Sequence, residues 1–100
     1  MNHLHIDGLK QGEETAYYKS GAVEYTLNHI DDLLQGEAIR YYASGEVKIK
    51  RNFIDGLIQG ENISYYESGE VQYRVNYVDD LLQGLQIHYL ETGEIDYTKL

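Results

Sequence analysis

The chain contains no cysteine, few basic residues and no long apolar run, and each absence excludes a class of protein. Without cysteine, its 100 residues form neither a disulfide nor a thiolate metal site. Eight Lys and Arg against 17 Asp and Glu give a formal charge of −9, which disfavours binding to a nucleic-acid backbone. No apolar run approaches the roughly 20 residues that cross a bilayer, and the N-terminal segment MNHLHIDG has no signal-peptide pattern. We therefore expect a cytoplasmic soluble protein.

Aromatic residues are nevertheless plentiful, and 11 of the 12 are tyrosine. A disordered acidic tail would not contain so many aromatic side chains, so the chain is expected to fold. Its negative charge suits solubility, or a basic protein partner that is attracted by electrostatic steering.

A unit of 24 residues repeats along the chain and is clearest at 31–54, DDLLQGEAIRYYASGEVKIKRNFI. The same unit fills 7–30 and 55–78, a shortened copy fills 79–100, and residues 1–6 form an N-terminal half-unit cap. Six unit positions are identical in all four copies: Asp at 1, Leu at 3, Gln at 5, Gly at 6, Tyr at 11 and Gly at 15. A fixed period of this length predicts a single repeat domain in which each unit packs against its neighbours.

Glycines mark the turns of each unit, and the segments between them are rich in Val, Ile, Tyr and Thr. Two strands per unit follow, at about 37–42 and 46–54 in the second copy. A three-residue loop of Ala43, Ser44 and Gly45, a type I turn with a glycine bulge, is expected to pair Tyr41 with Val47 and Ile39 with Ile49.

This register predicts an all-β fold, an open, twisted and elongated antiparallel meander of about nine strands in repeated hairpins. The expected inner face comprises Ile39, Tyr41, Val47, Ile49 and Phe53 and their equivalents. A one-sided sheet needs a cover, and the connector leucines are the candidates to fold back over it: Leu9, Leu33, Leu34, Leu57, Leu81 and Leu82.

Tyrosine-rich turns alternating with Asp-rich connectors resemble the MORN-repeat family. The matching segments are YYKSG, YYASG, YYESG and YLETG, with the connectors DGLKQG, DDLLQG, DGLIQG and DDLLQG. The chain looks like the 24-residue bacterial variant found in antitoxins of the YwqK type. The resemblance implies a row of open hairpins that acts as a protein-binding scaffold, with neutralisation of a toxin as the role in the antitoxin branch. Eukaryotic relatives imply association with membranes as a second possibility.

No set of residues in the sequence marks a catalytic, cofactor or metal site, so we expect no enzyme activity and no cofactor. Asp31-Asp32 and Asp79-Asp80 offer carboxylates for a hard cation, but their spacing is not that of a calcium loop, and capping of turns is the favoured interpretation. His3, His5 and His29 are a conceivable metal set. Phe53 and Tyr77 occupy the unit position of His29, which favours an aromatic packing role there.

Two groups of side chains are candidates for binding a partner. Arg40, Lys48, Lys50 and Arg51 place half of the basic residues in the second unit, where they either contact a partner or balance neighbouring glutamates across strands. An outer face of tyrosines at unit position 12 is the second candidate; in the open alternative these rings pack over the turn glycines. The tyrosines are Tyr18, Tyr42 and Tyr66.

The sequence therefore predicts a non-enzymatic protein-interaction module, an antitoxin or immunity protein that binds and blocks a toxin. Two alternatives remain: a membrane-associated scaffold, which the charge of −9 disfavours, and an acidic mimic that inhibits a nucleic-acid-binding enzyme. Exposed end strands also predict pairing between two copies, edge to edge.

Overall fold

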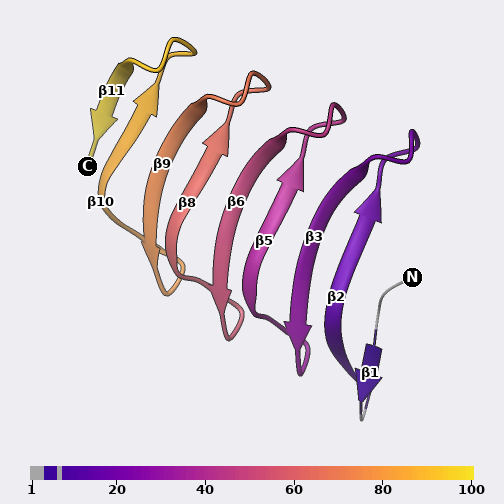
Figure 1. Ribbon diagram of the computed structural model, residues 1–100. Coiled ribbons are helices and arrows are strands. Elements are labelled where there is room, and N and C mark those ends of the chain that lie inside the picture. The colour runs from indigo at the N-terminus through magenta and orange to yellow at the C-terminus, as the bar shows by residue number, and fades with distance from the viewer. Residues whose placement is uncertain (1–3, 7) are drawn as a thin grey trace.

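A single antiparallel sheet makes up the computed structural model, which describes residues 4–6 and 8–100 (Figure 1). Nine strands follow one another as neighbours in chain order, which confirms the predicted meander. They are β1 (Leu4–Ile6), β2 (Leu9–Tyr17), β3 (Val23–Ile30), β5 (Gly36–Tyr41), β6 (Val47–Ile54), β8 (Gly60–Tyr65), β9 (Val71–Val78), β10 (Leu81–Tyr89) and β11 (Ile95–Lys99). Two short strands, β4 (Leu33–Leu34) and β7 (Leu57–Ile58), pair with β3 and β6.

The hairpin turn between β5 and β6 has the predicted geometry. The Gly45 amide donates to the Tyr42 carbonyl at 2.9 Å, and the Tyr42 amide donates to the Glu46 carbonyl at 2.8 Å. Gly45 has a φ of 100°, a backbone conformation that L side chains rarely adopt. The three-residue loop with its glycine bulge is therefore confirmed, and the other units repeat it.

A second bulge, which we did not predict, lies just beyond this turn. Tyr41 pairs with Val47 as expected, but Ile49 pairs with Arg40 instead of Ile39 because Lys48 is an extra residue in β6. Residues directly opposite each other share a face of the sheet, so the extra residue sends Ile49 and the rest of β6 to the other side. The expected Ile39–Ile49 pair and the single inner face were therefore wrong.

The connectors are tight two-residue turns. Asp31 and Asp32 have φ values of 51° and 70°, and Ile30 pairs with Leu33 across them. Positive φ at both central residues defines the type I′ turn, for which Asp-Gly is a preferred sequence and Asp a tolerated residue. The leucines that follow continue the hairpin instead of covering the sheet, so the predicted cover was wrong: Leu33 is 45% exposed.

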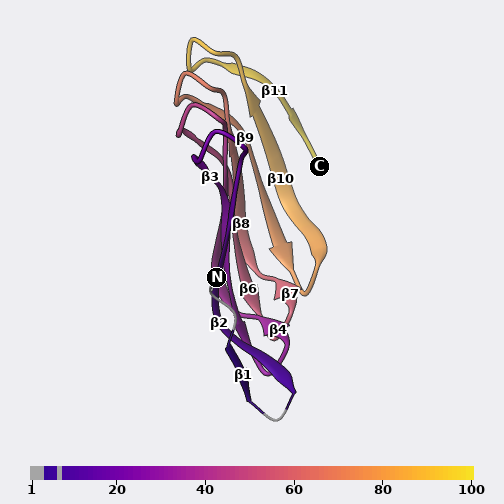
Figure 2. The same ribbon diagram turned by 90° about the vertical axis from the view of Figure 1, so that its right-hand side faces the viewer.

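The molecule is consequently a thin slab with almost no core. Its Cα extents are 48 × 34 × 13 Å, and Figure 2 shows the sheet as one curved layer. Among the side chains described, Val75 is the one buried hydrophobic residue. The described part of the chain has no helix that is long and apolar enough to cross a membrane.

Candidate functional site

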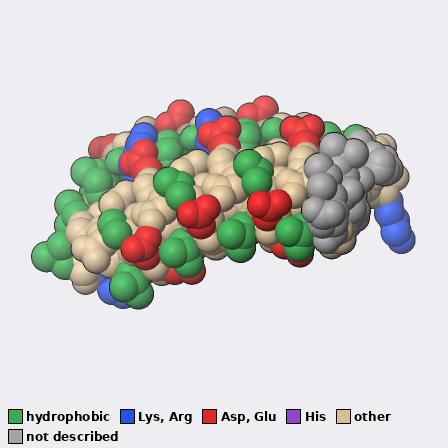
Figure 3. Space-filling model, turned by 90° about the horizontal axis from the view of Figure 1, so that it is seen from below, with side chains coloured by type: hydrophobic (Ala, Val, Ile, Leu, Met, Phe, Trp, Pro, Cys, Tyr) green, Lys and Arg blue, Asp and Glu red, His purple; other side chains and the backbone are tan. Residues whose placement is uncertain are grey.

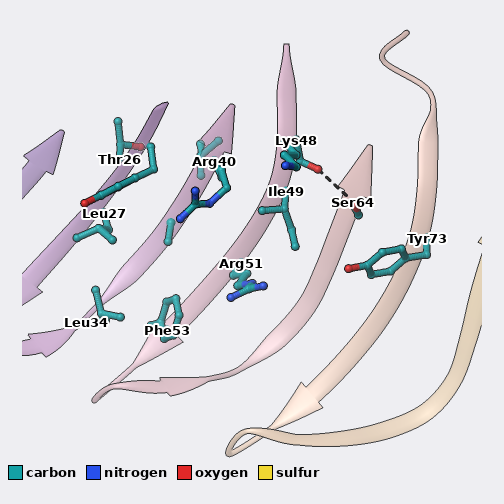
Figure 4. Close-up of a pocket in the computed structure, with 13 residues that line it drawn as sticks. Thr26, Leu27, Leu34, Arg40, Lys48, Ile49, Arg51, Phe53, Ser64 and Tyr73 are labelled. Carbon is teal, nitrogen blue, oxygen red and sulfur yellow. Dashed lines mark hydrogen bonds between the residues drawn. The ribbon is translucent and has the colours of Figure 1, made fainter. Parts of the chain in front are cut away.

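A groove lies on one face of the sheet, which we call the groove face. Register places Tyr25, Arg40, Ile49, Ser64 and Tyr73 side by side across five successive strands. With its neighbours, this row encloses a hollow of about 620 Å³ (Figure 4). Half of the side chains labelled around it are apolar or aromatic and half are polar or charged, including three cations: Thr26, Leu27, Leu34, Arg40, Lys48, Ile49, Arg51, Phe53, Ser64 and Tyr73.

Arg40 and Tyr25 form a charge-balanced cluster at one side of the groove. Arg40 Nη1 lies 3.4 Å from Glu24 Oε2, and its guanidinium carbon lies 5.4 Å from the centre of the Tyr25 ring. The Tyr25 hydroxyl donates to Glu14 Oε2 at 3.2 Å. That hydrogen bond favours the protonated phenol, so it raises the pKa of Tyr25 above its ordinary value. These groups already have partners within the protein.

Arg51 differs from the other two arginines because none of the described carboxylates pairs with it. Arg40 pairs with Glu24, and Arg74 Nη1 lies 3.2 Å from Glu61 Oε2, whereas among the described residues no acidic oxygen forms an ion pair with Arg51. Its Nε is buried without a hydrogen-bond partner. A half-buried guanidinium without a counter-charge is available to bind a carboxylate, which it can hold in a bidentate manner.

The residues of β8 beside Arg51, Ser64 and Asn62, are polar and buried. The Ser64 hydroxyl donates to the Lys48 carbonyl at 3.3 Å, the dashed line of Figure 4. Asn62 is only 3% exposed, and its Oδ1 has no partner. Lys50 of β6 pairs with Ile63 of β8, and the two strands are antiparallel. Asn62, the residue before Ile63, therefore lies opposite Arg51, the residue after Lys50. The structure therefore leaves a buried donor and a buried acceptor unpaired on neighbouring strands.

The predicted tyrosines serve a structural purpose that the sequence did not reveal. The Tyr18, Tyr42 and Tyr66 hydroxyls donate to backbone carbonyls 23 residues further along the chain, at 2.5, 2.6 and 2.6 Å. Each ring is half-buried and connects its unit to the next one. Partner binding by these tyrosines remains a prediction.

The predicted basic cluster is divided between the two faces. Lys48 lies above the Tyr42 ring, with Nζ 5.5 Å from its centre, and borders the groove together with Arg40 and Arg51. Lys50 pairs with Ile39 and Ile63 and therefore lies on the opposite face. The sequence grouped Arg51 with this cluster but gave no reason to single it out, and it did not bring Tyr25, Phe53 or Tyr73 to the site, because the second bulge was unknown.

The connector aspartates accept hydrogen bonds, but from donors of the preceding unit and not from the backbone of their own turn, so the expected capping was wrong in its partners. Asp31 Oδ1 accepts from Gln11 Nε2 at 2.5 Å, and Asp32 Oδ1 accepts from the Lys10 amide at 2.5 Å. The same glutamine contacts recur at Gln35–Asp55 and Gln59–Asp79, and the same amide contact recurs at Ile58–Asp80. The described residues contain no group of three His, Asp or Glu side chains arranged to hold a metal ion.

His29 behaves as an aromatic residue of the fold. It is 9% exposed and pairs with Gly12, as Phe53 pairs with Gly36 and Tyr77 with Gly60. An aromatic ring opposite glycine fills the space that the missing side chain leaves. His88 similarly stacks on Tyr97 with centroids 4.3 Å apart. His3 and the side chain of His5 lie outside the described residues.

Comparison with known proteins identifies the repeat. No curated protein and no solved structure gave a significant match. The family model described as the MORN repeat variant matches residues 10–31, 34–55 and 58–79, about two thirds of the chain. MORN repeats form interaction or scaffold modules that are not catalytic. The three matches follow the 24-residue period and span most of the segment from β2 to β9, so the chain belongs to the MORN repeat variant family.

Proposed function

We propose that this protein is a non-enzymatic binding module that neutralises a protein toxin by covering part of its surface. The observation that carries the proposal is the uncovered groove containing Arg51, a guanidinium for which the described part of the chain offers no carboxylate partner. A sheet with one buried apolar residue among those described has little core of its own, so its aromatic groove is available for a partner.

The groove suits an apolar segment that carries an acidic side chain. Apolar groups of this segment would contact the rings of Tyr25, Phe53 and Tyr73, and its carboxylate would meet Arg51. The charge of −9 over the whole chain favours encounter with a partner that is basic overall, which speeds association. A partner that is basic overall can still carry one acidic side chain for Arg51. The overall charges act at long range, and the contact with Arg51 acts only at short range.

The test begins with native capture on the tagged chain, followed by expression of the captured protein alone and with the chain. We expect growth arrest by the captured protein alone and normal growth when both are present. A captured protein that is harmless would contradict neutralisation.

A pair of variants then tests the site. Arg51→Gln removes the unpaired charge and is expected to weaken binding at least about tenfold, since hydrogen bonds to charged groups contribute roughly 1.5–3 kcal/mol. Lys50→Gln removes the same charge from the opposite face and is expected to bind like the unmodified protein. Equal affinities of the two variants would exclude the groove.

We also propose that two copies associate through β11. All five residues of this end strand are exposed, and Ile95 and Tyr97 are 59% and 50% exposed. An unpaired strand edge is a template for another strand. Light scattering at increasing concentration is expected to show a dimer that a proline at Asp96 reduces, and a constant monomer mass would refute this association.

A further inference from the structure

A second exposed surface lies at the end of the sheet where the connectors turn, on the face opposite the groove. Leu34 lines the groove, so its neighbour Leu33 points away from it. Leu33, its partner Ile30 and their counterparts at the two later connectors form a row that we call the connector stripe, whose members are between 38% and 65% exposed: Ile30, Leu33, Ile54, Leu57, Val78 and Leu81. Figure 3 views the molecule from this end, and hydrophobic and acidic side chains alternate along it.

The stripe continues from one unit to the next. Ile30 pairs directly with Leu33, Ile54 with Leu57 and Val78 with Leu81 across each turn. Between units, Leu33 Cδ2 lies 3.3 Å from the position that a Cβ on Gly56 would occupy. Leu is invariant at unit position 3, yet it is 65% exposed at Leu81. Leu9, Leu33 and Leu57 are also exposed, at 36%, 45% and 38%, so every copy of this leucine presents apolar surface to solvent.

Carboxylates border the stripe on both sides. The turns beyond it carry five exposed aspartates, Asp31, Asp32, Asp55, Asp79 and Asp80. On the side towards the middle of the sheet lie three exposed glutamates, which pair with Asn28, Asn52 and Asn76 of the neighbouring strands: Glu13, Glu37 and Glu61. Nearly half of the 17 acidic residues thus surround one apolar row.

The spacing of the stripe matches that of an α-helix. Its six side chains come from successive strands, so one apolar group recurs about every 4.8 Å over about 24 Å. A helix with apolar residues at alternating three- and four-residue spacing presents one about every 5.3 Å, so six of them span about 26 Å in about 18 residues. The two lengths agree to within the reach of flexible side chains.

We propose that the connector stripe is a docking surface for a basic amphipathic helix that lies across the strands. Its apolar face would cover the stripe, and Lys or Arg on both borders of that face would meet the aspartates and glutamates. A second copy of this chain would bring like charges together, and an anionic lipid surface would be repelled in the same way. The proposal goes beyond the function assigned to the groove and does not depend on it.

The probe is a synthetic 21-residue peptide of three heptads, with Leu at the first and fourth positions, Lys at the fifth and seventh, and Ala elsewhere. Two controls have the same length: one carries Glu in place of every Lys, and the other has the Leu and Lys positions scrambled. Fluorescence anisotropy against the full chain at low salt measures binding. We expect the first peptide to bind at least about tenfold more tightly than either control, with an affinity that falls as salt rises.

Variants of the chain locate the contact. Leu33→Ser combined with Leu57→Ser is expected to weaken the probe about tenfold, because two central apolar contacts are lost. Asp32→Gly combined with Asp80→Gly gives these turns the Asp-Gly sequence of Asp55-Gly56 and is expected to weaken binding severalfold at low salt only. Arg51→Gln, in the groove, is the control and is expected to leave binding of this peptide unchanged. Circular dichroism confirms that each variant remains folded.

Three results would overturn the proposal. They are tight binding of the Glu-containing peptide, no binding of the Lys-containing peptide, and full affinity of the folded Leu33→Ser, Leu57→Ser double variant for the Lys-containing peptide. Loss of probe binding in Arg51→Gln would place the helix in the groove and overturn it as well. Because the toxin experiment depends on Arg51 and this one does not, either proposal can fail while the other holds.

Discussion

At the hairpin end of each of the first three units, a tyrosine hydroxyl donates to a backbone carbonyl 23 residues further along. At the connector end of the same units, a glutamine amide donates to an aspartate 20 residues further along. Both contacts connect one unit to the next, as neighbouring units must do in a repeat without an independent core. The tyrosines are half-buried, whereas the glutamine–aspartate pairs are exposed to water. The hairpin end should therefore contribute more to stability, and the connector end should tolerate more change.

The two turns also place different demands on their residues. Gly45 at the hairpin end has a φ of 100°, and its equivalents in the other units are glycine as well. At unit position 2 of the connector, glycine alternates with aspartate, and Asp32 and Asp80 have φ values of 70° and 71°. Aspartate tolerates this region better than most residues, and its carboxylate accepts an amide of the preceding unit.

The largest difference is expected between Gly45→Ala and Gly56→Asp. A Cβ at position 45 meets nothing within 4 Å, so the cost of Gly45→Ala is backbone strain, about 1–3 kcal/mol of the free energy of unfolding. Gly56→Asp introduces the residue that two other units already have, and the nearby Leu33 methyl can move, so a change within about 0.5 kcal/mol is expected. Urea denaturation measures both, and equal losses would remove the distinction between the two turns.

The next largest effect concerns the tyrosine contacts. Tyr42→Phe leaves the half-buried Tyr65 carbonyl without its side-chain donor and is expected to lower the free energy of unfolding by about 1 kcal/mol. Tyr17 is 59% exposed, and no hydrogen bond of its hydroxyl is found among the described residues, so Tyr17→Phe is the matched control. A loss of the same size in the control would show that the contact between units is unimportant.

At the connector end the corresponding change should be smaller. Gln35→Met removes the exposed hydrogen bond to Asp55 but keeps the side-chain length, and about 0.5 kcal/mol is expected to be lost. Gln83 occupies the same unit position in the fourth copy, and no hydrogen bond of its side chain is found among the described residues. Gln83→Met should therefore have no effect, and thermal unfolding of the two variants under identical conditions compares them.

The smallest effect is a pH dependence on the groove face. The Glu14 carboxylate raises the pKa of Tyr25 above 10.0 in the folded protein. Because the pKa of Tyr25 is higher in the folded protein than in the unfolded chain, its hydrogen bond stabilises the fold fully at pH values below the unfolded pKa. This stabilisation disappears as the pH rises through the folded pKa. The difference in unfolding free energy between the unmodified protein and Tyr25→Phe should be constant from about pH 7 to pH 9 and should shrink above about pH 10. A difference that stays constant up to about pH 11 would contradict this contact.

The sequence predicted the repeated elements well because glycine and tyrosine recur at fixed positions. The hairpin turn at Gly45 and the Tyr41–Val47 pair followed from the requirement for positive φ at that glycine. The bulge at Lys48 was missed because its backbone conformation needs no special residue, and unit position 18 contains Glu24, Lys48, Gln72 and Asp96 in the four copies. Every face assignment beyond that bulge was therefore inverted.

The groove could not be predicted for the same reason. Arg51 and Phe53 belong to it only because the bulge brings them to the side of Arg40 and Tyr25. The connectors show a different limit: Asp at unit position 1 indicated a turn, but its hydrogen bond to a glutamine of the preceding unit depends on how the units stack. The hairpin turn and the pair next to it were accessible from the sequence, whereas the register beyond the bulge and the contacts between units required the structure.

Methyl-resolved NMR of the isoleucine side chains, recorded with and without the natively captured partner, tests the central claim most directly. Ile49 reports on the groove, Ile63 on the opposite face and Ile54 on the connector stripe. Binding in the groove predicts that the Ile49 methyl resonance shifts while that of Ile63 is unchanged, and that Arg51→Gln abolishes the shift. A shift at Ile63 with an unchanged Ile49 resonance would contradict the assignment of the groove as the binding surface.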